Sequence, residues 1–182
     1  MKKQALVFWF TGLSGAGKTT VASRVSEALT RRGILVFVLD GDVFRASQSR
    51  HLGFSESDIK QNNALIAEHC ARLRSEYDVI LVPIISPYAV SRQKAREVLG
   101  QGFYEIYLEA SLDCLVARDP KGLYRKARNQ EITTLIGYSA TNPYEAPASA
   151  DLVIPTDRVT PETSAALLER FVGERLADAH LA

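Results

Sequence analysis

The chain has 182 residues, of which 46% are hydrophobic and 24% charged, and its formal net charge is +1. This length and composition predict a single soluble domain over residues 1–182, with a core large enough to fold without disulfides. The near-neutral charge argues against a general affinity for nucleic acid or membranes, so an anion site must come from a local cluster of cations.

The first elements have the pattern of a phosphate loop. Residues 5–10 are apolar and predict a strand, while residues 20–31 carry apolar side chains on one helical face. The segment between them fits G-x-x-x-x-G-K-[ST], in which backbone N–H groups at a helix N-terminus surround an anion. The alternative is a glycine-rich turn with a chance Lys-Thr pair, which the flanking strand and helix argue against. We expect ATP to bind the whole loop: Gly12, Leu13, Ser14, Gly15, Ala16, Gly17, Lys18 and Thr19.

Two residues of this loop have the chemistry of phosphoryl transfer. The Lys18 ammonium would reach the β- and γ-phosphates of ATP, and the Thr19 hydroxyl would ligate a Mg²⁺ ion that bridges them. The sequence therefore predicts ATP and Mg²⁺ as cofactors.

Strands and helices alternate through the rest of the chain. We expect strands over residues 34–39, 78–86, 104–109 and 151–155, and helices over residues 58–77, 89–99, 112–118 and 161–179. Ser57 and Ser111 are the expected helix caps, and Pro161 is an expected helix start. The unbroken apolar run 34–39 predicts a strand buried on both faces. Pro83 must lie near the end of its strand or at a bulge, because it cannot donate a ladder hydrogen bond.

This alternation predicts an α/β fold, a doubly wound, mostly parallel sheet of five strands with helices on both faces. Residues 118–147 are too long for an ordinary connection, and loops of that length are commonly lids or binding elements. We call residues 118–147 the lid segment.

The two cysteines, Cys70 and Cys114, fall in helix-like apolar patterns. We expect them to fill core positions in a reducing compartment, with no disulfide. The residues before the first strand leave no room for a signal peptide, and no apolar run approaches the ~18 residues of a membrane span. The expected location is the cytoplasm.

Polar side chains follow the second and third strands, at the edge where parallel sheets bind ligands. Asp42, near Arg45, would act either as the base that accepts the proton of an acceptor hydroxyl or as an anchor for the metal, and we favour the base. Ser86 is expected on an exposed turn. Its hydroxyl would either hydrogen-bond the acceptor or carry the phosphoryl group covalently, and direct transfer favours the binding role.

The first part of the lid segment, residues 118–128, has five basic residues and one acid. Lys121, Arg125 and Arg128 are spaced i, i+4 and i+7, which predicts one shared helix face. A solvated surface helix is the alternative, but like charges at this spacing repel each other. We favour a mobile phosphate clamp in which Arg118 and Arg128 contact ATP.

Several longer motifs together resemble the adenylylsulfate kinase (APS kinase) family over residues 5–156. They are, in chain order, GLSGAGKTT, LDGDVFR, LGFS, ISPY, ARDPKGLYRKAR and YEAP. The resemblance implies a P-loop fold like that of nucleoside-monophosphate kinases. It also implies transfer of the ATP γ-phosphate to the 3′-hydroxyl of adenosine 5′-phosphosulfate, which yields PAPS and ADP, and a place in sulfate assimilation.

The resemblance also implies residue roles on the acceptor side. Asp42, Arg45 and Asn62 would bind the acceptor, Phe54 would stack on its adenine, and Lys121 would contact it from the lid segment. Ile85 and Ser86 would line the same site, and Ser86 matches a serine described in the family as a phosphoserine intermediate. A homodimer is left open.

The chain departs from the family pattern mainly on the acceptor side. Arginines of the family are replaced at Ile59, Ala64, Leu65 and Ala89, and an asparagine at Val43. Leu135 and Ile136 stand where the family has Phe-Thr, and that phenylalanine closes an aromatic sandwich on the acceptor base, so Leu135 is the expected counterpart in this site.

Three interpretations follow from these matches and departures. The first is an APS kinase. The second is a 3′-hydroxyl kinase for another 5′-substituted nucleotide, for example a cytidine diphosphate derivative, which the missing arginines would suit. The third is a non-catalytic nucleotide-binding or switch protein. The chain lacks an N-K-x-D motif after a strand and keeps Lys18, Thr19 and Asp42, so we favour the two kinases.

Overall fold

The computed structural model describes residues 4–181. Its five strands form one sheet with the order β2-β3-β1-β4-β5, and every neighbouring pair is parallel. The strands are β1 (Leu6–Thr11), β2 (Val36–Val38), β3 (Val79–Val82), β4 (Phe103–Glu109) and β5 (Leu152–Pro155). The predicted doubly wound five-stranded sheet is confirmed.

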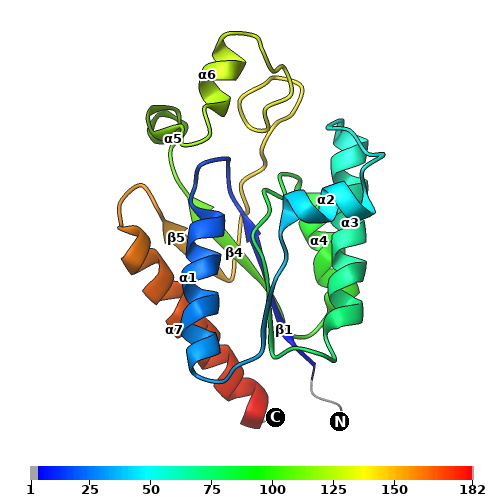
Figure 1. The fold of residues 1–182 in the computed structure, drawn as a ribbon, viewed down its shortest axis with the longest axis vertical. Helices are drawn as coiled ribbons and strands as arrows, with labels where there is room; N and C mark the ends of the chain where they lie inside the picture. The colour runs from blue at the N-terminus through cyan, green and yellow to red at the C-terminus, as the bar shows by residue number, and fades with distance from the viewer. Residues whose placement is uncertain (1–3, 182) are drawn as a thin grey trace.

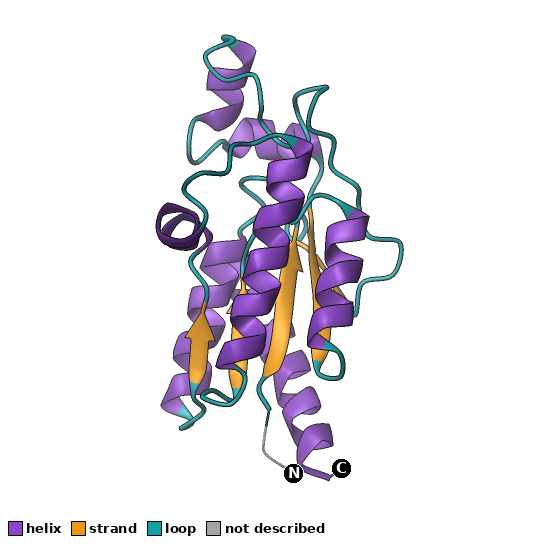
Figure 2. Cartoon of the chain, turned by 90° about the vertical axis from the view of Figure 1, so that its right-hand side faces the viewer, coloured by secondary structure: helices purple, strands orange, loops and turns teal. Residues whose placement is uncertain are grey.

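Helices cover both faces of the sheet (Figures 1 and 2). They are α1 (Lys18–Arg31), α2 (Gly41–Gln48), α3 (Glu56–Leu73), α4 (Ala89–Leu99), α5 (Leu112–Arg118), α6 (Leu123–Arg128) and α7 (Pro161–Leu181). Helices α1 and α7 pack together on one face, and α3 and α4 pack together on the other.

The central strand β1 supplies both cores because successive strand side chains point to opposite faces. Phe8 and Phe10 join the core under α1 and α7, while Val7 and Trp9 join the core under α3 and α4. All six residues of β1 are buried, so the strand that leads into the phosphate loop is held from both sides.

The strand predictions differ from the structure at one edge. Strand β2 is an edge strand whose residues are only half-buried, and Leu35 beside it is 61% exposed. Val36 and Val38 pack against one core and Phe37 against the other, so the predicted burial on both faces is only partial. An apolar run does not distinguish an edge strand from a central one. The predicted strand 78–86 was too long at its carboxyl end: β3 ends at Val82, and Pro83 follows directly after it, which agrees with the expectation that this proline marks the strand's end.

The helix predictions hold for α4 and α5 and fail at both ends of α3. Helix α4 spans the predicted residues, and Ser111 caps α5 by accepting a hydrogen bond from the Cys114 N–H. Helix α3 is capped by Ser55, and the predicted cap Ser57 was wrong. Helix α3 also ends at Leu73, four residues earlier than the predicted 77.

One helix, α2, was not predicted. It lies within residues that the sequence assigned to a turn and a polar connection, and of its side chains only Phe44 is buried. Its start depends on Asp40, whose carboxylate accepts hydrogen bonds from the N–H groups of Asp42 and Val43. A helix of eight residues with one buried side chain has little apolar periodicity to detect.

Both cysteines are free thiols, with Cys70 buried in α3 and Cys114 half-buried in α5. Burial raises the pKa of the Cys70 thiol to about 12, so it stays protonated at neutral pH. Over the described part of the chain, no helix combines the length and the apolar character that a bilayer crossing requires.

Candidate active site

The phosphate loop joins the carboxyl end of β1 to the first turn of α1. Gly17 is the N-cap of α1 with φ +91°, a left-handed conformation that favours glycine. Gly12 is tightly enclosed, because a Cβ added there would lie 2.6 Å from the Leu108 carbonyl oxygen. The strand, loop and helix that the sequence predicted are therefore in place, with the helix N-terminus directed at the loop.

Lys18 is the central cation of this loop. Its side chain is 8% exposed, and its Nζ donates hydrogen bonds to the carbonyl oxygens of Gly12 (2.7 Å) and Leu13 (2.8 Å). Burial, and then the nearby cation Lys121, lower the pKa of Lys18 to about 7. An anion at this position would favour the charged form of the amine, so the loop is electrostatically prepared for phosphate.

The Thr19 side chain is exposed in the first turn of α1. Its hydroxyl is the kind of oxygen ligand that Mg²⁺ prefers. Within residues 4–181, no cluster of three or more His, Cys, Asp or Glu side chains could hold a metal ion. This donor set fits a Mg²⁺ ion that takes most of its ligands from nucleotide phosphates and water.

The two acids after β2 have different roles. Asp40 caps α2 through its side chain, with distances of 2.9 Å to the Asp42 and Val43 nitrogens. Asp42 lies in the first turn of α2 and is exposed, so its carboxylate faces solvent at the ligand edge. Capping thus falls to Asp40, and Asp42 is left available as the base or the metal anchor that the sequence predicted.

The acceptor-side residues Arg45 and Phe54 form a cation–π pair. The Arg45 guanidinium lies 4.7 Å from the centroid of the Phe54 ring, and it donates to the carbonyl oxygens of Leu52 and Gly53. Phe54 is 53% exposed, which leaves a face of the ring open to a planar ligand. Asn62 is buried, and its side-chain oxygen accepts a hydrogen bond from Ser49, so it fastens the segment before Phe54.

Ser86 differs from its prediction. It is 2% exposed, so the expectation of an exposed turn was wrong. Its hydroxyl accepts hydrogen bonds from Trp9 Nε1 (3.0 Å) and Asn63 Nδ2 (3.2 Å). The chain turns inward after Pro83 and packs against β1, which removes the hydroxyl from solvent. This placement favours a role in shaping the site over a covalent phosphoryl carrier, which needs an accessible hydroxyl.

Ile85 lies beside the phosphate loop through its backbone. Its carbonyl oxygen accepts hydrogen bonds from the Gly12 N–H (3.3 Å) and the Thr11 hydroxyl (2.9 Å). The acceptor-side turn and the loop are therefore joined directly.

The lid segment lies above the carboxyl edge of the sheet (Figure 1). Its helix α6 contains Arg125 and Arg128, but Lys121 precedes the helix, so the predicted shared face of all three cations was wrong. The left-handed Gly122 is the N-cap at which α6 begins. Asp119, the acid of this stretch, accepts hydrogen bonds from the Tyr124 and Arg125 N–H groups of that helix. Arg118 donates to the Thr156 carbonyl oxygen, and Arg128 is exposed.

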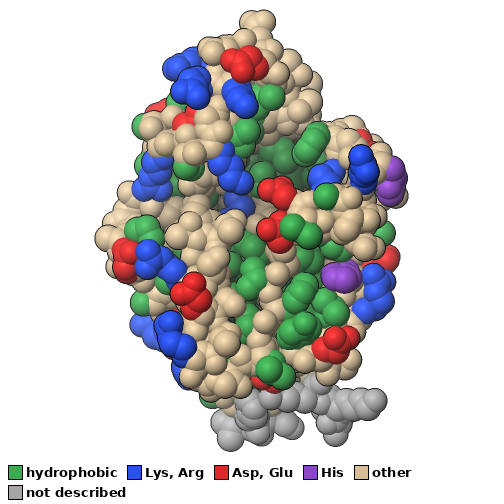
Figure 3. Space-filling view, in the orientation of Figure 1, with side chains coloured by type: hydrophobic (Ala, Val, Ile, Leu, Met, Phe, Trp, Pro, Cys, Tyr) green, Lys and Arg blue, Asp and Glu red, His purple; other side chains and the backbone are tan. Residues whose placement is uncertain are grey.

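Three contacts seat the lid segment on the site. The Tyr124 hydroxyl donates to the Ser14 carbonyl oxygen (2.9 Å) of the phosphate loop. Gly137 lies against Leu13 so closely that an added Cβ would be 2.1 Å from Leu13 Cδ2. The buried Asn142 donates to the Phe54 carbonyl oxygen (3.2 Å). Basic side chains gather over the lid segment and continue into the hollow below it (Figure 3).

The comparisons with known proteins agree with this geometry. A family model described as Adenylylsulphate kinase matches residues 4–155. This chain belongs to the adenylylsulphate kinase family. An adenylyl-sulfate kinase of Geotalea uraniireducens is 43% identical over 174 residues, which cover 95% of this chain and 83% of that protein. One of Paraburkholderia xenovorans is 44% identical over 153 residues, which cover 84% of each chain.

A solved structure of the family supports the same assignment. The Mycobacterium tuberculosis APS kinase in complex with AMPPNP and APS is 38% identical to this chain, with a TM-score of 0.82. The similarity covers 91% of this chain and 96% of that one. The shared fold thus extends over most of this adenylylsulphate kinase family member.

Sequence reasoning missed several residues that hold this site together. They are Thr11, Asn63, Arg92, Asn142 and Tyr144, and they act through contacts between segments far apart in the chain. The sequence contains a signal for Arg92, which is a charged residue on the apolar face of α4, three residues before the buried Ala95. A buried arginine must be paired or hydrogen-bonded, so such a position deserves a search for its partners.

Proposed function

We propose that this protein transfers the γ-phosphate of ATP to the 3′-hydroxyl of adenosine 5′-phosphosulfate, with PAPS and ADP as products. The observation that carries this proposal is the 38% identity, over 91% of the chain, to an APS kinase solved with AMPPNP and APS. The contacts of the phosphate loop, α2 and the lid segment around one hollow support it.

The donor half of the proposed reaction uses the phosphate loop. Its backbone N–H groups would hold the ATP phosphates, and Lys18 would stabilise the charge that grows on the transferred group. Lys121 raises the positive potential at the same point, as its effect on the Lys18 pKa indicates. A Mg²⁺ ion, held in part by Thr19, would supply further charge neutralisation when bound. Arg118 and Arg128 are proposed to assist from the lid segment.

The acceptor half uses the exposed side chains around α2. Phe54 would stack on the adenine, while Arg45 fixes the ring from behind at 4.7 Å. Asp42 would accept the proton of the 3′-hydroxyl as it attacks, which requires only that its carboxylate reach that hydroxyl. The docked lid segment would exclude water, which would otherwise compete as acceptor.

Two departures from the family pattern concern interior positions. Ile59 is 3% exposed and Leu135 is 8% exposed, and Leu135 packs into the core shared with α1 and α7. Neither side chain offers an open surface to an acceptor in this arrangement, so the prediction that Leu135 contacts the acceptor is not supported. The alternative of a cytidine diphosphate derivative as acceptor likewise lacks support from the comparisons.

The proposal also includes the cellular location, the pathway and the oligomeric state of the protein. The free thiols of Cys70 and Cys114 agree with a reducing cytoplasm, and the proposed reaction would serve sulfate assimilation. A homodimer remains a prediction, which sedimentation of the purified protein would test.

The test of the proposed function is product formation with a panel of acceptors. We expect ADP and PAPS from Mg-ATP with adenosine 5′-phosphosulfate, and much slower ADP release with cytidine diphosphate derivatives or with water alone. Faster turnover of another nucleotide would contradict the proposal.

A further inference from the structure

Ser86 has a backbone conformation that its surroundings must impose. Its φ is +44°, in the left-handed region that side chains other than glycine rarely adopt. Its carbonyl oxygen accepts a hydrogen bond from Arg92 Nη1 (2.8 Å) and a second from Thr11 Oγ1 (3.1 Å), whose single proton is shared with the Ile85 carbonyl oxygen. The carbonyl is therefore held from β1 and from α4 at once.

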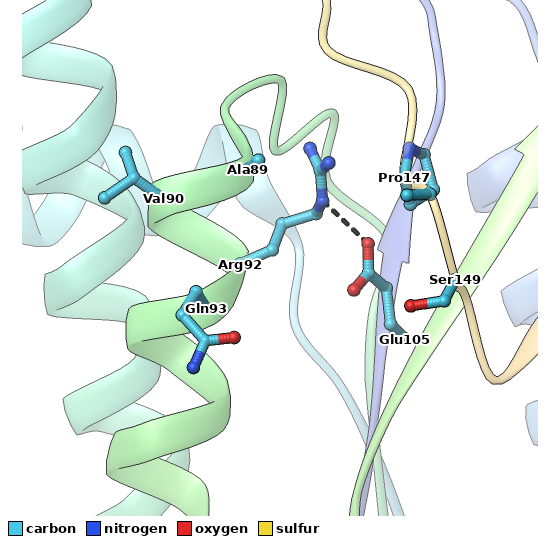
Figure 4. Close-up of a pocket in the computed structure, with 8 residues that line it drawn as sticks. Ala89, Val90, Arg92, Gln93, Glu105, Pro147 and Ser149 are labelled. Atoms are coloured by element: carbon cyan, nitrogen blue, oxygen red, sulfur yellow. Dashed lines mark ion pairs between the residues drawn. The ribbon is translucent and has the colours of Figure 1, made fainter.

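All three guanidinium nitrogens of Arg92 contact protein groups. Besides the Ser86 carbonyl, its Nη2 donates to the Glu145 carbonyl oxygen (2.8 Å), and its Nε pairs with Glu105 Oε1 (2.7 Å). The arginine is 3% exposed, so it is closed off from a ligand. Figure 4 shows Arg92 extending from α4 toward Glu105 on β4, beside a cavity of about 330 Å³.

Glu105 keeps this buried cation neutralised. Burial raises the pKa of the Glu105 carboxyl, and Arg92 opposes that shift as its main counter-charge. Arg96 lies further off, at 3.9 Å from Glu105, and is bound to Asp151 at the molecular surface. Arg92 and Glu105 therefore act as one buried pair, and removal of one partner would leave the other charge uncompensated.

The Arg92 contacts join the end of the lid segment to the acceptor-side turn. At Glu145 the backbone N–H donates to the Pro87 carbonyl oxygen (2.9 Å), and the carboxylate accepts from the Ala89 N–H (2.6 Å). The adjacent Tyr144 hydroxyl bonds Thr11, the residue before the phosphate loop, at 2.9 Å. The phosphate loop, the Ser86 turn and the end of the lid segment thus meet around one guanidinium.

We propose that Arg92, with Glu105 as its counter-charge, is a positioning residue of the kinase reaction, which sets the acceptor-side turn and the end of the lid segment relative to the phosphate loop. This inference rests on the proposed function. The planar guanidinium of arginine directs its N–H donors to several partners at once. A lysine ammonium has the same charge but is a single point at the end of its chain, so it would not hold the Ser86 and Glu145 carbonyls together.

The test compares Arg92→Lys with the control Arg96→Lys, which changes an arginine near the same Glu105 that has no bond to Ser86 or Glu145. We expect Arg92→Lys to raise the KM for adenosine 5′-phosphosulfate and to lower kcat by at least tenfold each, with the KM for ATP within twofold. The control should stay within twofold in all three constants. If Arg92→Lys folds poorly, the double variant Arg92→Gln with Glu105→Gln replaces it, because it removes both charges of the pair. It should show the same pattern: a higher KM for adenosine 5′-phosphosulfate, a lower kcat and an unchanged KM for ATP.

A merely structural role would give a different result. Loss of folded protein would lower the apparent kcat and leave both KM values unchanged, and that outcome, or equal effects in both arginine variants, would overturn the proposal. If the wild-type protein fails to phosphorylate adenosine 5′-phosphosulfate, the proposed function is wrong. The positioning role of Arg92 is then tested separately, by hydrogen exchange. With the nonhydrolysable analogue AMPPNP bound, exchange at residues 86–89 and 142–147 should rise at least tenfold in Arg92→Lys, with α1 unchanged. Unchanged exchange would again overturn the positioning role.

Discussion

Lys18 is a buried amine whose charged form is disfavoured by its surroundings. Its pKa of about 7 means that the amine of the free protein is mostly neutral at pH 8, whereas bound phosphates would favour the ammonium. Binding of Mg-ATP at pH 8 should therefore take up about one proton, and ATP affinity should fall by up to about tenfold per pH unit above pH 7.

Titration calorimetry in two buffers of different ionisation enthalpy measures this proton uptake. The variant Lys18→Met should bind ATP more weakly and take up no proton. Proton uptake near zero in the wild-type protein at pH 8 would mean that Lys18 is already charged before ATP arrives.

Asp42 and Asp40 form a matched pair for testing the base. Asp42→Asn retains the shape but removes the proton acceptor, so kcat should fall by at least a hundredfold while Mg-ATP affinity is kept. Asp40→Asn is the control, because asparagine caps a helix about as well as aspartate does. Steady-state kinetics and ATP titration separate the outcomes, and loss of Mg-ATP binding in Asp42→Asn would assign Asp42 to the metal instead.

Among the elements, the lid segment depends on a glycine that contacts the phosphate loop. Gly137 has φ +76°, and a Cβ there would lie 2.1 Å from Leu13 Cδ2 and 3.1 Å from Tyr144 Cβ. Gly137→Ala should therefore displace either the Leu13 side chain of the phosphate loop or the lid segment, and lower kcat by at least tenfold, equivalent to about 1.4 kcal/mol.

Gly33 provides the control for this substitution. Its φ of +78° is nearly the same, but nothing lies within 4 Å of an added Cβ. Gly33→Ala should cost about 1 kcal/mol of stability from backbone strain alone and leave turnover per folded molecule unchanged. Equal kinetic effects of the two alanines would show that the Leu13 contact is unimportant.

The elements also show what a sequence can predict. The phosphate loop, α4, α5 and the start of α7 carry their signals locally, in glycines, caps and periodic apolar residues. The edge position of β2 and the burial of Ser86 depend on contacts with distant segments. Ser86 and its partner Trp9 are 77 residues apart, and no pattern near either one indicates their contact.

At the scale of the whole molecule, a buried arginine lies at each end of the sheet, and we expect one to affect catalysis and the other to affect only stability. Arg92 lies at the carboxyl end with the site, whereas Arg74 follows α3 at the amino end. Arg74 is 8% exposed and donates to the carbonyl oxygens of Ala5, Leu99 and Gln101. It thereby joins the start of β1 to the connection between α4 and β4, on the side away from any substrate.

Substitution of Arg74 should therefore affect stability without affecting the kinetics. Arg74→Lys keeps the charge but loses two of the three directed hydrogen bonds, each worth about 1.5–3 kcal/mol because the donor is charged. We expect the free energy of unfolding to fall by about 3 kcal/mol and the Tm by roughly 6–12 °C for a domain of this size. Denaturant titration and thermal scans measure this loss, and both KM values should stay within twofold at a temperature where the variant is folded. A rise in either KM would show that the amino end of the sheet is coupled to the site after all, because strain there would then reach the phosphate loop through β1.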